Sequence, residues 1–295
     1  MNTTMIFRNA ALIALGGLTA WGAQAQERIA VPLSDAARPA VLEVDAFGTA
    51  INVNAYDGKE VVIVARENTA KEAEDDDDHR VPGPRPRPPR ERGKADGDDE
   101  ASTAGLHRIP NTSIGLTATE ENNLVTVKTD FSRQRLALDI SVPRNTSVHL
   151  KAVNGGDVTV TGVRGEHEIS NVSGRIVAND IAGSLVASTT NGTLRASFTE
   201  VTTAKPMSFN TFNGDVDVTF PAKLVATLRV TTGHGDFYTD FDVAVQSQPA
   251  VVTQGGGQNG RYEVRLERET VVAVGKGGPD IRFKTFNGNV MVRKR

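Results

Sequence analysis

The sequence predicts an all-β fold, a β-solenoid or stacked β-repeat sheet with rungs of about 18–22 residues. The first observation is a short repeat in which a glycine is followed by an alternating strand. The second is composition, because 28 glycines with only one tryptophan and three tyrosines favour short strands and tight turns over helices. The chain also has no cysteine, which does not bear on the fold class but excludes disulfides, thiol nucleophiles and thiolate metal sites.

The repeat unit consists of a small polar residue, glycine, a polar residue and an apolar residue that begins an alternating strand. Two of its copies read T-F-N-G-D-V-D-V from Thr211 and T-F-N-G-N-V-M-V from Thr285. A rung of this length cannot form a core by itself, so neighbouring rungs must stack about 4.8 Å apart and bury each other's apolar faces. The glycines that mark the corners are Gly156, Gly174, Gly192, Gly214, Gly235 and Gly288.

Strands of the same kind precede these repeats, at 41–44, 50–53, 61–64, 124–128 and 136–142. Because these strands have the same length and alternation as the repeats, we expect them to belong to the same stack. The sequence therefore predicts one elongated β-solenoid domain over residues 38–295, preceded by an N-terminal linker at 26–37.

Residues 1–25 have the features of a signal peptide. Arg8 supplies the positive charge, residues 10–18 are apolar, and the small residues at 23–25 predict cleavage after Ala25. The apolar run is shorter than the ~20 residues of a membrane span, which disfavours a retained anchor, and no later stretch reaches that length. We therefore expect a periplasmic or secreted protein with no transmembrane segment in the mature chain.

The segment at 71–104 interrupts the predicted domain with a different composition. An acidic run at 72–78 is followed by alternating arginine and proline and then by a second acidic run at 96–100. Proline blocks helix and ladder formation and apolar side chains are nearly absent, so we expect a disordered insertion. Two further hypotheses are a weak divalent-cation site at Asp75–Asp78 with His79, which lacks the fixed geometry of a calcium loop, and contact of the arginine-proline tract with an anionic envelope polymer.

The units N-G-D-V-x-V and V-S-G-x-I-x-A, preceded by the strand L-D-I-S-V-P at 138–143, resemble the bacterial putative adhesin family, domains of unknown function. The chain is similar, more distantly, to the head domains of putative autotransporter adhesins. The resemblance covers nearly all of the mature chain except the insertion, and it implies a stacked, solenoid-like β fold at the bacterial envelope. No catalytic residues are defined for the family, so the resemblance assigns none.

Three aspartates occupy equivalent positions after corner glycines, namely Asp157, Asp215 and Asp236. On a parallel β-helix, such a line could supply the acid and the base of a polysaccharide lyase or hydrolase. The simpler interpretation is that each aspartate caps its corner, because the same position elsewhere holds arginine, threonine or asparagine. The three tyrosines are scattered and the tryptophan lies in the signal peptide, so the sequence shows no aromatic cluster for sugar stacking.

The histidines are isolated in the sequence. His167-Glu168 begins like a zinc-protease motif, but Asn171 stands where the second histidine is needed. His167 also falls where neighbouring repeats have an apolar residue, which predicts a hydrogen-bonded or rim histidine rather than a ligand. The oxygen ligand set of a calcium β-roll is absent as well. The sequence thus assigns no catalytic, cofactor-binding or metal-binding residue, and the ligand-binding residues are unknown.

We expect an exported, non-enzymatic protein that acts through its repetitive β surface, as an adhesin-like or cell-envelope scaffold protein. With 33 basic and 36 acidic residues, the chain has no net positive field for nucleic acid, so an envelope polysaccharide or envelope protein is the expected partner. No cofactor is expected. The first alternative is the polysaccharide-active β-helix enzyme.

The second alternative is a protein-interaction module that binds by strand addition. The C-terminal strand at 289–292 could serve as the docking strand, or its basic end at 293–295 could guard an open edge against pairing. Exposed edge strands commonly carry such charges, so the guard is the favoured interpretation.

Overall fold

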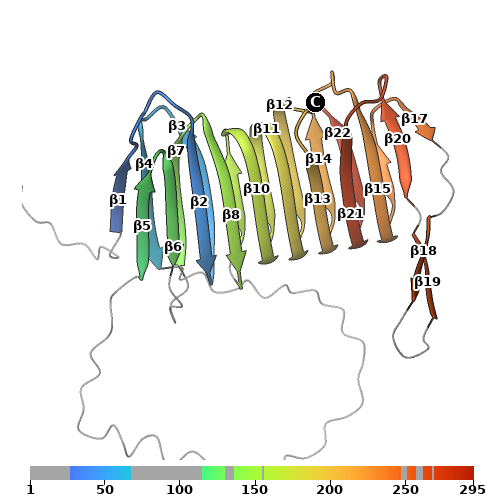
Figure 1. The fold of residues 1–295 in the computed structure, drawn as a ribbon, viewed down its shortest axis with the longest axis horizontal. Coiled ribbons are helices and arrows are strands. Elements are labelled where there is room, and N and C mark those ends of the chain that lie inside the picture. Colours follow the sequence, from blue (N-terminus) through green and yellow to red (C-terminus); the bar gives the residue numbers. More distant parts are fainter. Residues whose placement is uncertain are drawn as a thin grey trace, which may run out of the picture.

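A computed structural model gives the structure of residues 27–67, 115–129, 136–154, 156–246, 251–256, 262–267 and 269–295. Over these residues the chain forms strands and turns without a helix (Figure 1). The predicted all-β, stacked-repeat fold class is confirmed. The expected signal peptide and the whole expected insertion at 71–104 lie outside the described residues, so both stay predictions.

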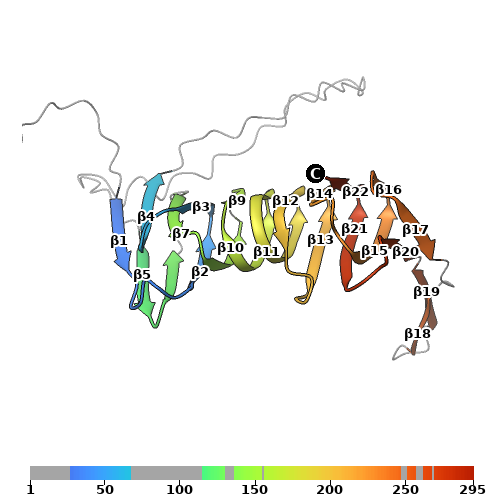
Figure 2. The same ribbon diagram turned by 90° about the horizontal axis from the view of Figure 1, so that it is seen from above.

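Two rows of hydrogen-bonded strands run along the molecule, and β11 contributes to both, which joins them into one 20-stranded sheet (Figures 1 and 2). In spatial order, the first face consists of β5 (Leu116–Glu121), β6 (Leu124–Thr129), β2 (Ala40–Phe47), β8 (Thr146–Val153), β10 (Arg164–Ser173), the C-terminal part of β11 (Ile176–Asn191), β13 (Met207–Asn213), β21 (Asp280–Asn287), β15 (Ala226–His234), β20 (Thr270–Val274) and β17 (Val243–Gln246).

The second face lies opposite the first. In spatial order it consists of β1 (Glu27–Pro32), β4 (Glu60–Glu67), β7 (Leu136–Pro143), β3 (Thr49–Tyr56), β9 (Val158–Thr161), the N-terminal part of β11, β12 (Leu194–Val201), β14 (Val216–Phe220), β22 (Val290–Lys294) and β16 (Phe237–Thr239). A separate antiparallel hairpin is formed by β18 (Val251–Gly256) and β19 (Tyr262–Glu267).

Interior strands pair in parallel, as the stacking of equivalent rungs requires, and antiparallel pairs occur toward the two ends. One end strand, β1, lies within the stretch at 26–37 for which the sequence predicted a linker. It pairs with β4 along its whole length, and its Val31 is buried. The short alternation of apolar and polar residues before Pro32 explains why this stretch forms a strand.

The order of the rungs in space differs from their order in the sequence. The rung β21–β22 lies between β13–β14 and β15–β16, and the rung β2–β3 lies between β6–β7 and β8–β9. The 53-residue interval between Gly235 and Gly288 therefore spans strands β16 to β21, after which the chain returns to an inner place in the stack. The corner glycines follow one another in space as Gly156, Gly174, Gly192, Gly214, Gly288 and Gly235.

Inward-facing side chains form one apolar cluster along the interior of the stack. In its C-terminal half, Phe198 stacks on Phe220 and Phe209 stacks on Phe283, with 5.1 Å between ring centroids in each pair. Phe209 also meets the other pair edge to face, at 6.3 Å. Such offset and edge contacts add to the free energy gained from burying the rings, so this half of the core is firmly packed.

Candidate functional site

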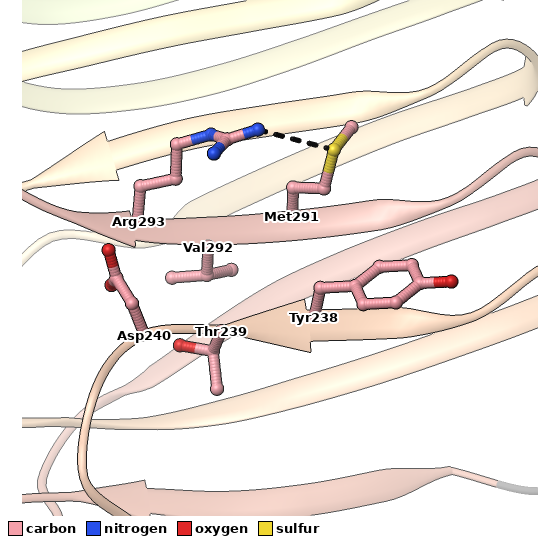
Figure 3. Close-up of a pocket in the computed structure, with 6 residues that line it drawn as sticks. All are labelled: Tyr238, Thr239, Asp240, Met291, Val292 and Arg293. Atoms are coloured by element: carbon pink, nitrogen blue, oxygen red, sulfur yellow. Dashed lines mark hydrogen bonds between the residues drawn. The ribbon is translucent and has the colours of Figure 1, made fainter.

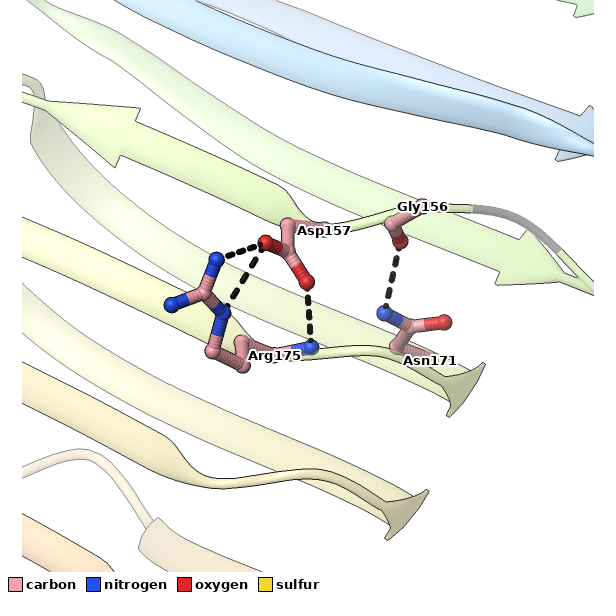
Figure 4. Close-up of polar contacts among 4 residues, drawn as sticks. All are labelled: Gly156, Asp157, Asn171 and Arg175. Carbon is pink, nitrogen blue, oxygen red and sulfur yellow. Dashed lines mark hydrogen bonds and ion pairs between the residues drawn. The ribbon is translucent and has the colours of Figure 1, made fainter. Parts of the chain in front are cut away.

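The corner aspartates bond to the next rung of the stack. Asp157 Oδ1 accepts a hydrogen bond from the Arg175 backbone N–H at 2.8 Å, and Asp157 Oδ2 pairs with the Arg175 guanidinium at 2.6 Å (Figure 4). Further along, Asp215 Oδ1 accepts from the Asn289 N–H at 2.7 Å, and Asn289 Oδ1 accepts from the Asp236 N–H at 2.9 Å. Side chains at this position therefore cap corners and join rungs.

The rung order also separates the three aspartates. The corners of Gly174 and Gly192 lie between those of Asp157 and Asp215, and Asn289 lies between Asp215 and Asp236. At about 4.8 Å per rung, the corners of Asp215 and Asp236 are roughly 10 Å apart. Catalytic carboxyl pairs in glycosidases are about 5–9.5 Å apart. The line of acids that the sequence offered to an enzyme is thus interrupted. Asp157 and Asp215 use their carboxylates in the corners. The Asp236 carboxylate instead accepts a hydrogen bond from Tyr238.

His167 is a buried core residue whose ring nitrogens make no hydrogen bond of good geometry with the described residues. It lies on β10 between Val148 and Leu185 of the neighbouring strands and is 3% exposed. Burial lowers the pKa of His167 to about 4, because an apolar interior disfavours the charged ring. Backbone groups of Ala182 and Val163 lie near enough to oppose this lowering of the pKa. The prediction of a rim histidine is therefore wrong, since the side chain occupies a core position of the repeat, and the predicted hydrogen bond is not formed with good geometry.

The remaining histidines do not form a metal site where the structure can be described. His149 and His234 are exposed on different strands, and His79 and His107 lie outside the described residues together with Asp75–Asp78. Across the described part of the chain, no three histidine, aspartate or glutamate side chains are grouped so that they could hold a metal ion.

The C-terminal strand is not an edge strand. β22 pairs with β14 on one side and with β16 on the other, so its backbone is not available for strand addition. Arg293 and Arg295 form ion pairs with Asp217 and Asp180, which makes them contacts between strands and not guards of an edge. Both interpretations of residues 289–295 are therefore wrong, because they assumed that the last rung in sequence is the last rung in space.

The fold places the two T-F-N-G motifs, at 211–214 and 285–288, on neighbouring strands β13 and β21. In each copy the threonine hydroxyl donates to the glycine carbonyl of the preceding rung, at 3.0 and 3.1 Å. The asparagine of the second copy donates from Nδ2 to Oδ1 of the asparagine of the first, at 2.7 Å. The polar residues of the motif thus hold consecutive corners in register.

The phenylalanines of these motifs form an exposed aromatic pair. Phe212 and Phe286 stack with 4.9 Å between ring centroids and an interplanar angle of 6°, and they are 51% and 41% exposed. His234, on the next rung, meets the edge of Phe286 at 5.1 Å. Aromatic side chains therefore line the outer side of the first face beside the corners.

A groove of about 420 Å³ crosses β16 and β22 on the outer side of the second face (Figure 3). Tyr238 and Met291 form its apolar end, and Asp240 and Arg293 form its charged end (Figure 3). Tyr238 is 54% exposed. The residues that line the groove are Tyr238, Thr239, Asp240, Met291, Val292 and Arg293.

Neighbouring residues hold the polar groups of this groove. The Tyr238 hydroxyl donates to Asp236 Oδ2 at 3.3 Å, and the negative charge of Asp236 together with this hydrogen bond raises the pKa of Tyr238. Arg293 donates from Nε to Asp217 Oδ1 at 2.8 Å. Asp240 Oδ1 accepts from the Lys294 backbone N–H at 2.6 Å, and its second oxygen makes no hydrogen bond with the described residues. The groove therefore presents a phenol ring, a guanidinium and a carboxylate in fixed positions.

The groove was not predicted from the sequence, because Tyr238 and Met291 are 53 residues apart and lie in different repeats. A usable signal was present, since both residues follow a corner glycine by three positions and alternation places that position on the outer face. Only the rung order brings the two side chains together.

Residues 110–270, more than half of the chain, match the family model described as Toastrack DUF4097. The chain belongs to the Toastrack family. The chain is similar in structure to a solved protein described as a putative cell adhesion protein from Clostridium sporogenes ATCC 15579. The two share 9% sequence identity and align with a TM-score of 0.44, and the alignment covers 92% of this chain and 99% of the other. No curated protein matches the Toastrack chain. No helix among its described residues could cross a membrane.

Proposed function

We propose that this Toastrack protein is exported, is not an enzyme, and acts as an adhesin-like or envelope scaffold protein through the outer surface of its rungs. The observation that carries the proposal is the groove on β16 and β22, where Tyr238 and Met291 lie at the surface beside Asp240 and Arg293. Tyrosine, methionine and arginine are enriched at recognition surfaces, and exposed apolar side chains gathered beside polar ones mark interaction sites.

The stacked scaffold suits such a role. Ladders of threonine and asparagine contacts hold the corners in register, and stacked phenylalanines fill the core between the neighbouring rungs. A rigid surface loses little conformational entropy when it binds, which favours recognition. The bonds from Asp157 and Asp215 to backbone N–H groups of the next rung favour this role over acid-base catalysis at the corners.

The location and domain organisation belong to the same proposal. Residues 1–25 act as a cleavable signal peptide, so the mature protein, residues 26–295, works in the periplasm or outside the cell. Residues 27–295 form one solenoid domain that begins with β1, and the charged segment at 71–104 is an insertion between strands β4 and β5. Its partner is an envelope polysaccharide or an envelope protein.

Binding of the exported protein, residues 26–295, to whole cells, peptidoglycan, lipopolysaccharide and a glycan panel tests the proposal. A matched protein lacking 71–104 is measured beside it at two salt concentrations. We expect saturable binding that survives both the higher salt and the deletion. Loss of binding on deletion would move recognition to the insertion. Absence of binding to every fraction, or polysaccharide turnover that Asp215→Asn abolishes, would overturn the proposal.

A further inference from the structure

Building on the proposed function, we propose that the groove on β16 and β22 binds a neutral glycan. In this arrangement, the apolar side of one sugar ring packs against Tyr238 and Met291, and the hydroxyl groups at its rim bond to Asp240 and Arg293. These residues form the two ends of one groove of about 420 Å³, which is within the size range of small-ligand sites.

The two ends of the groove match the two kinds of surface on a sugar ring. A pyranose has C–H groups on its ring faces and hydroxyl groups around its rim, so it needs an apolar wall and nearby donors and acceptors. Tyr238 is 54% exposed and gives a flat aromatic wall, which Met291 extends. The Arg293 guanidinium donates hydrogen bonds and the second oxygen of Asp240 accepts them, so vicinal hydroxyl groups can bond to both.

The groups at the polar end are already oriented. Arg293 is held by Asp217 through Nε at 2.8 Å, and its Nη2 lies 3.6 Å from the Met291 sulfur (Figure 3). Asp240 is held by the backbone N–H of Lys294. Binding therefore orders few additional side chains, and this lowers its entropic cost.

The charges of the groove favour a neutral ligand over an anionic one. Its lining carries one carboxylate, on Asp240, and one guanidinium, on Arg293, and the guanidinium is already paired with Asp217. Asp236 adds a further negative charge beside Tyr238. A uronate or phosphate polymer would meet these carboxylates without an unpaired cation among the residues that line the groove, whereas a hexose or N-acetylhexosamine would not be repelled.

The contacts of β16, the strand at the end of the second face, favour a glycan over an added peptide strand. β16 covers only three residues, and short edge strands disfavour further pairing. Its corner is closed by its own side chains, because the Thr232 hydroxyl donates to the Gly235 carbonyl at 2.9 Å and Tyr238 donates to Asp236. In the interior rungs, the equivalent threonine bonds to the glycine of the neighbouring rung instead.

The test titrates residues 26–295 with cellotetraose, chitotetraose and polygalacturonate. This chain contains three tyrosines, and two of the variants remove the Tyr238 phenol, so isothermal titration calorimetry measures every affinity. We expect saturation by at least one neutral tetrasaccharide and none by polygalacturonate. Tyr238→Ala and Asp240→Asn should each weaken binding at least about tenfold, whereas Tyr238→Phe, which keeps the ring, should stay within about threefold of the parent.

Phe212→Ser is the matched control, since it removes an aromatic ring that is 51% exposed on the first face, outside the groove. Its glycan affinity should equal that of the parent protein, and the melting temperature of every variant identifies any that fails to fold. Unchanged binding by Tyr238→Ala, equal losses in Phe212→Ser, or preference for polygalacturonate would overturn the inference.

Parallel measurements on envelope fractions separate this inference from the proposed function. If the parent protein binds cells but no neutral glycan, or if protease treatment of the cells removes the binding partner, the glycan inference fails and the surface-binding role stands. If the parent protein binds no envelope fraction, the proposed function fails with it.

Discussion

Corner glycines are the residues on which the stack depends most directly. Gly214 has φ +146°, and a side chain there would meet the carbonyl group of Gly192 on the rung below. Gly48 also has positive φ, at +65°, but a side chain there would meet open space. An alanine in place of Gly48 would therefore cost only backbone conformational energy, whereas an alanine in place of Gly214 would also prevent close contact between two rungs.

Replacing Gly214 by alanine should lower the free energy of unfolding by about 2–4 kcal/mol, because both costs apply. Gly48→Ala should cost only about 1 kcal/mol, from the left-handed backbone alone. Urea unfolding followed by circular dichroism measures both. Equal losses in the two variants would contradict close rung contact at Gly214.

His167 makes stability depend on pH. Its pKa is about 4 in the folded protein against 6.5 for a free ring, so between these values the unfolded chain binds more protons. The stability associated with the neutral buried ring is therefore complete above pH 6.5 and is lost as the pH falls toward 4. The total loss is about 3 kcal/mol for this shift.

His167→Leu should remove that part of the pH dependence and stabilise the protein at pH 7, because leucine is the residue at the equivalent position 185 of the next rung. Urea unfolding at pH 7.5 and 4.5 compares the variant with the parent. His234→Ser, which changes an exposed histidine on β15, is the control and should keep the parent's pH dependence. If His167→Leu also kept the parent's pH dependence of stability, the buried ring would not be the source of that dependence.

At the scale of the element, alternation along one strand separates core from surface. β13 directs Phe209 into the core, where it stacks on Phe283, and directs Phe212 outward, where it stacks on Phe286. The same pairing of β13 with β21 sets both stacks. Burial therefore distinguishes two phenylalanines that have similar aromatic partners.

Phe209→Ala should cost about 3–5 kcal/mol of unfolding free energy, since it leaves a cavity in the core. Phe212→Ala should cost about 1 kcal/mol, which is the range for an aromatic pair with little burial. Thermal and urea unfolding measure the difference between these two variants of one strand. A large loss for Phe212→Ala would show that the outer pair carries more stability than its exposure indicates.

At the scale of the whole molecule, the last rung in sequence holds an interior position. β21 pairs with β13 on one side and β15 on the other, and β22 pairs with β14 and β16 in the same way. In stacked repeats each rung is stabilised by its immediate neighbours. The C-terminal residues therefore support strands that precede them by more than 70 positions, as the pairing of Val216 with Val290 illustrates.

A chain truncated before residue 280 should lose the order of the strands after β12, because β13 and β15 no longer share a neighbour. Limited proteolysis should then cut within 207–246 and leave 136–201 protected. Deletion of 71–104 is the control and should preserve the protease pattern, since long surface insertions add little to stability. Continued protection of 207–246 after truncation would contradict the interior position of the last rung.

Local patterns in the sequence predicted much of the fold but little of the groove. Alternation identified the strands and their inward side chains, and glycines such as Gly174 and Gly192 marked the corners. The capping role of Asp157 was one of two interpretations, and the bond to Arg175 identifies it. The interior position of β22 was not foreseen, because it depends on which rungs become neighbours. The apolar register already placed His167 at a core position, but a polar side chain there favoured the prediction of a rim position.

The sequence by itself determined the all-β class, the length of the rungs and the direction in which most side chains point, because these follow from local alternation and glycine conformation. Only the tertiary structure decided the order of the rungs. Equivalent rungs present similar edges, so periodicity does not specify which rung stacks on which. That long-range choice places β22 beside β16, and with it Met291 and Arg293 beside Tyr238 and Asp240.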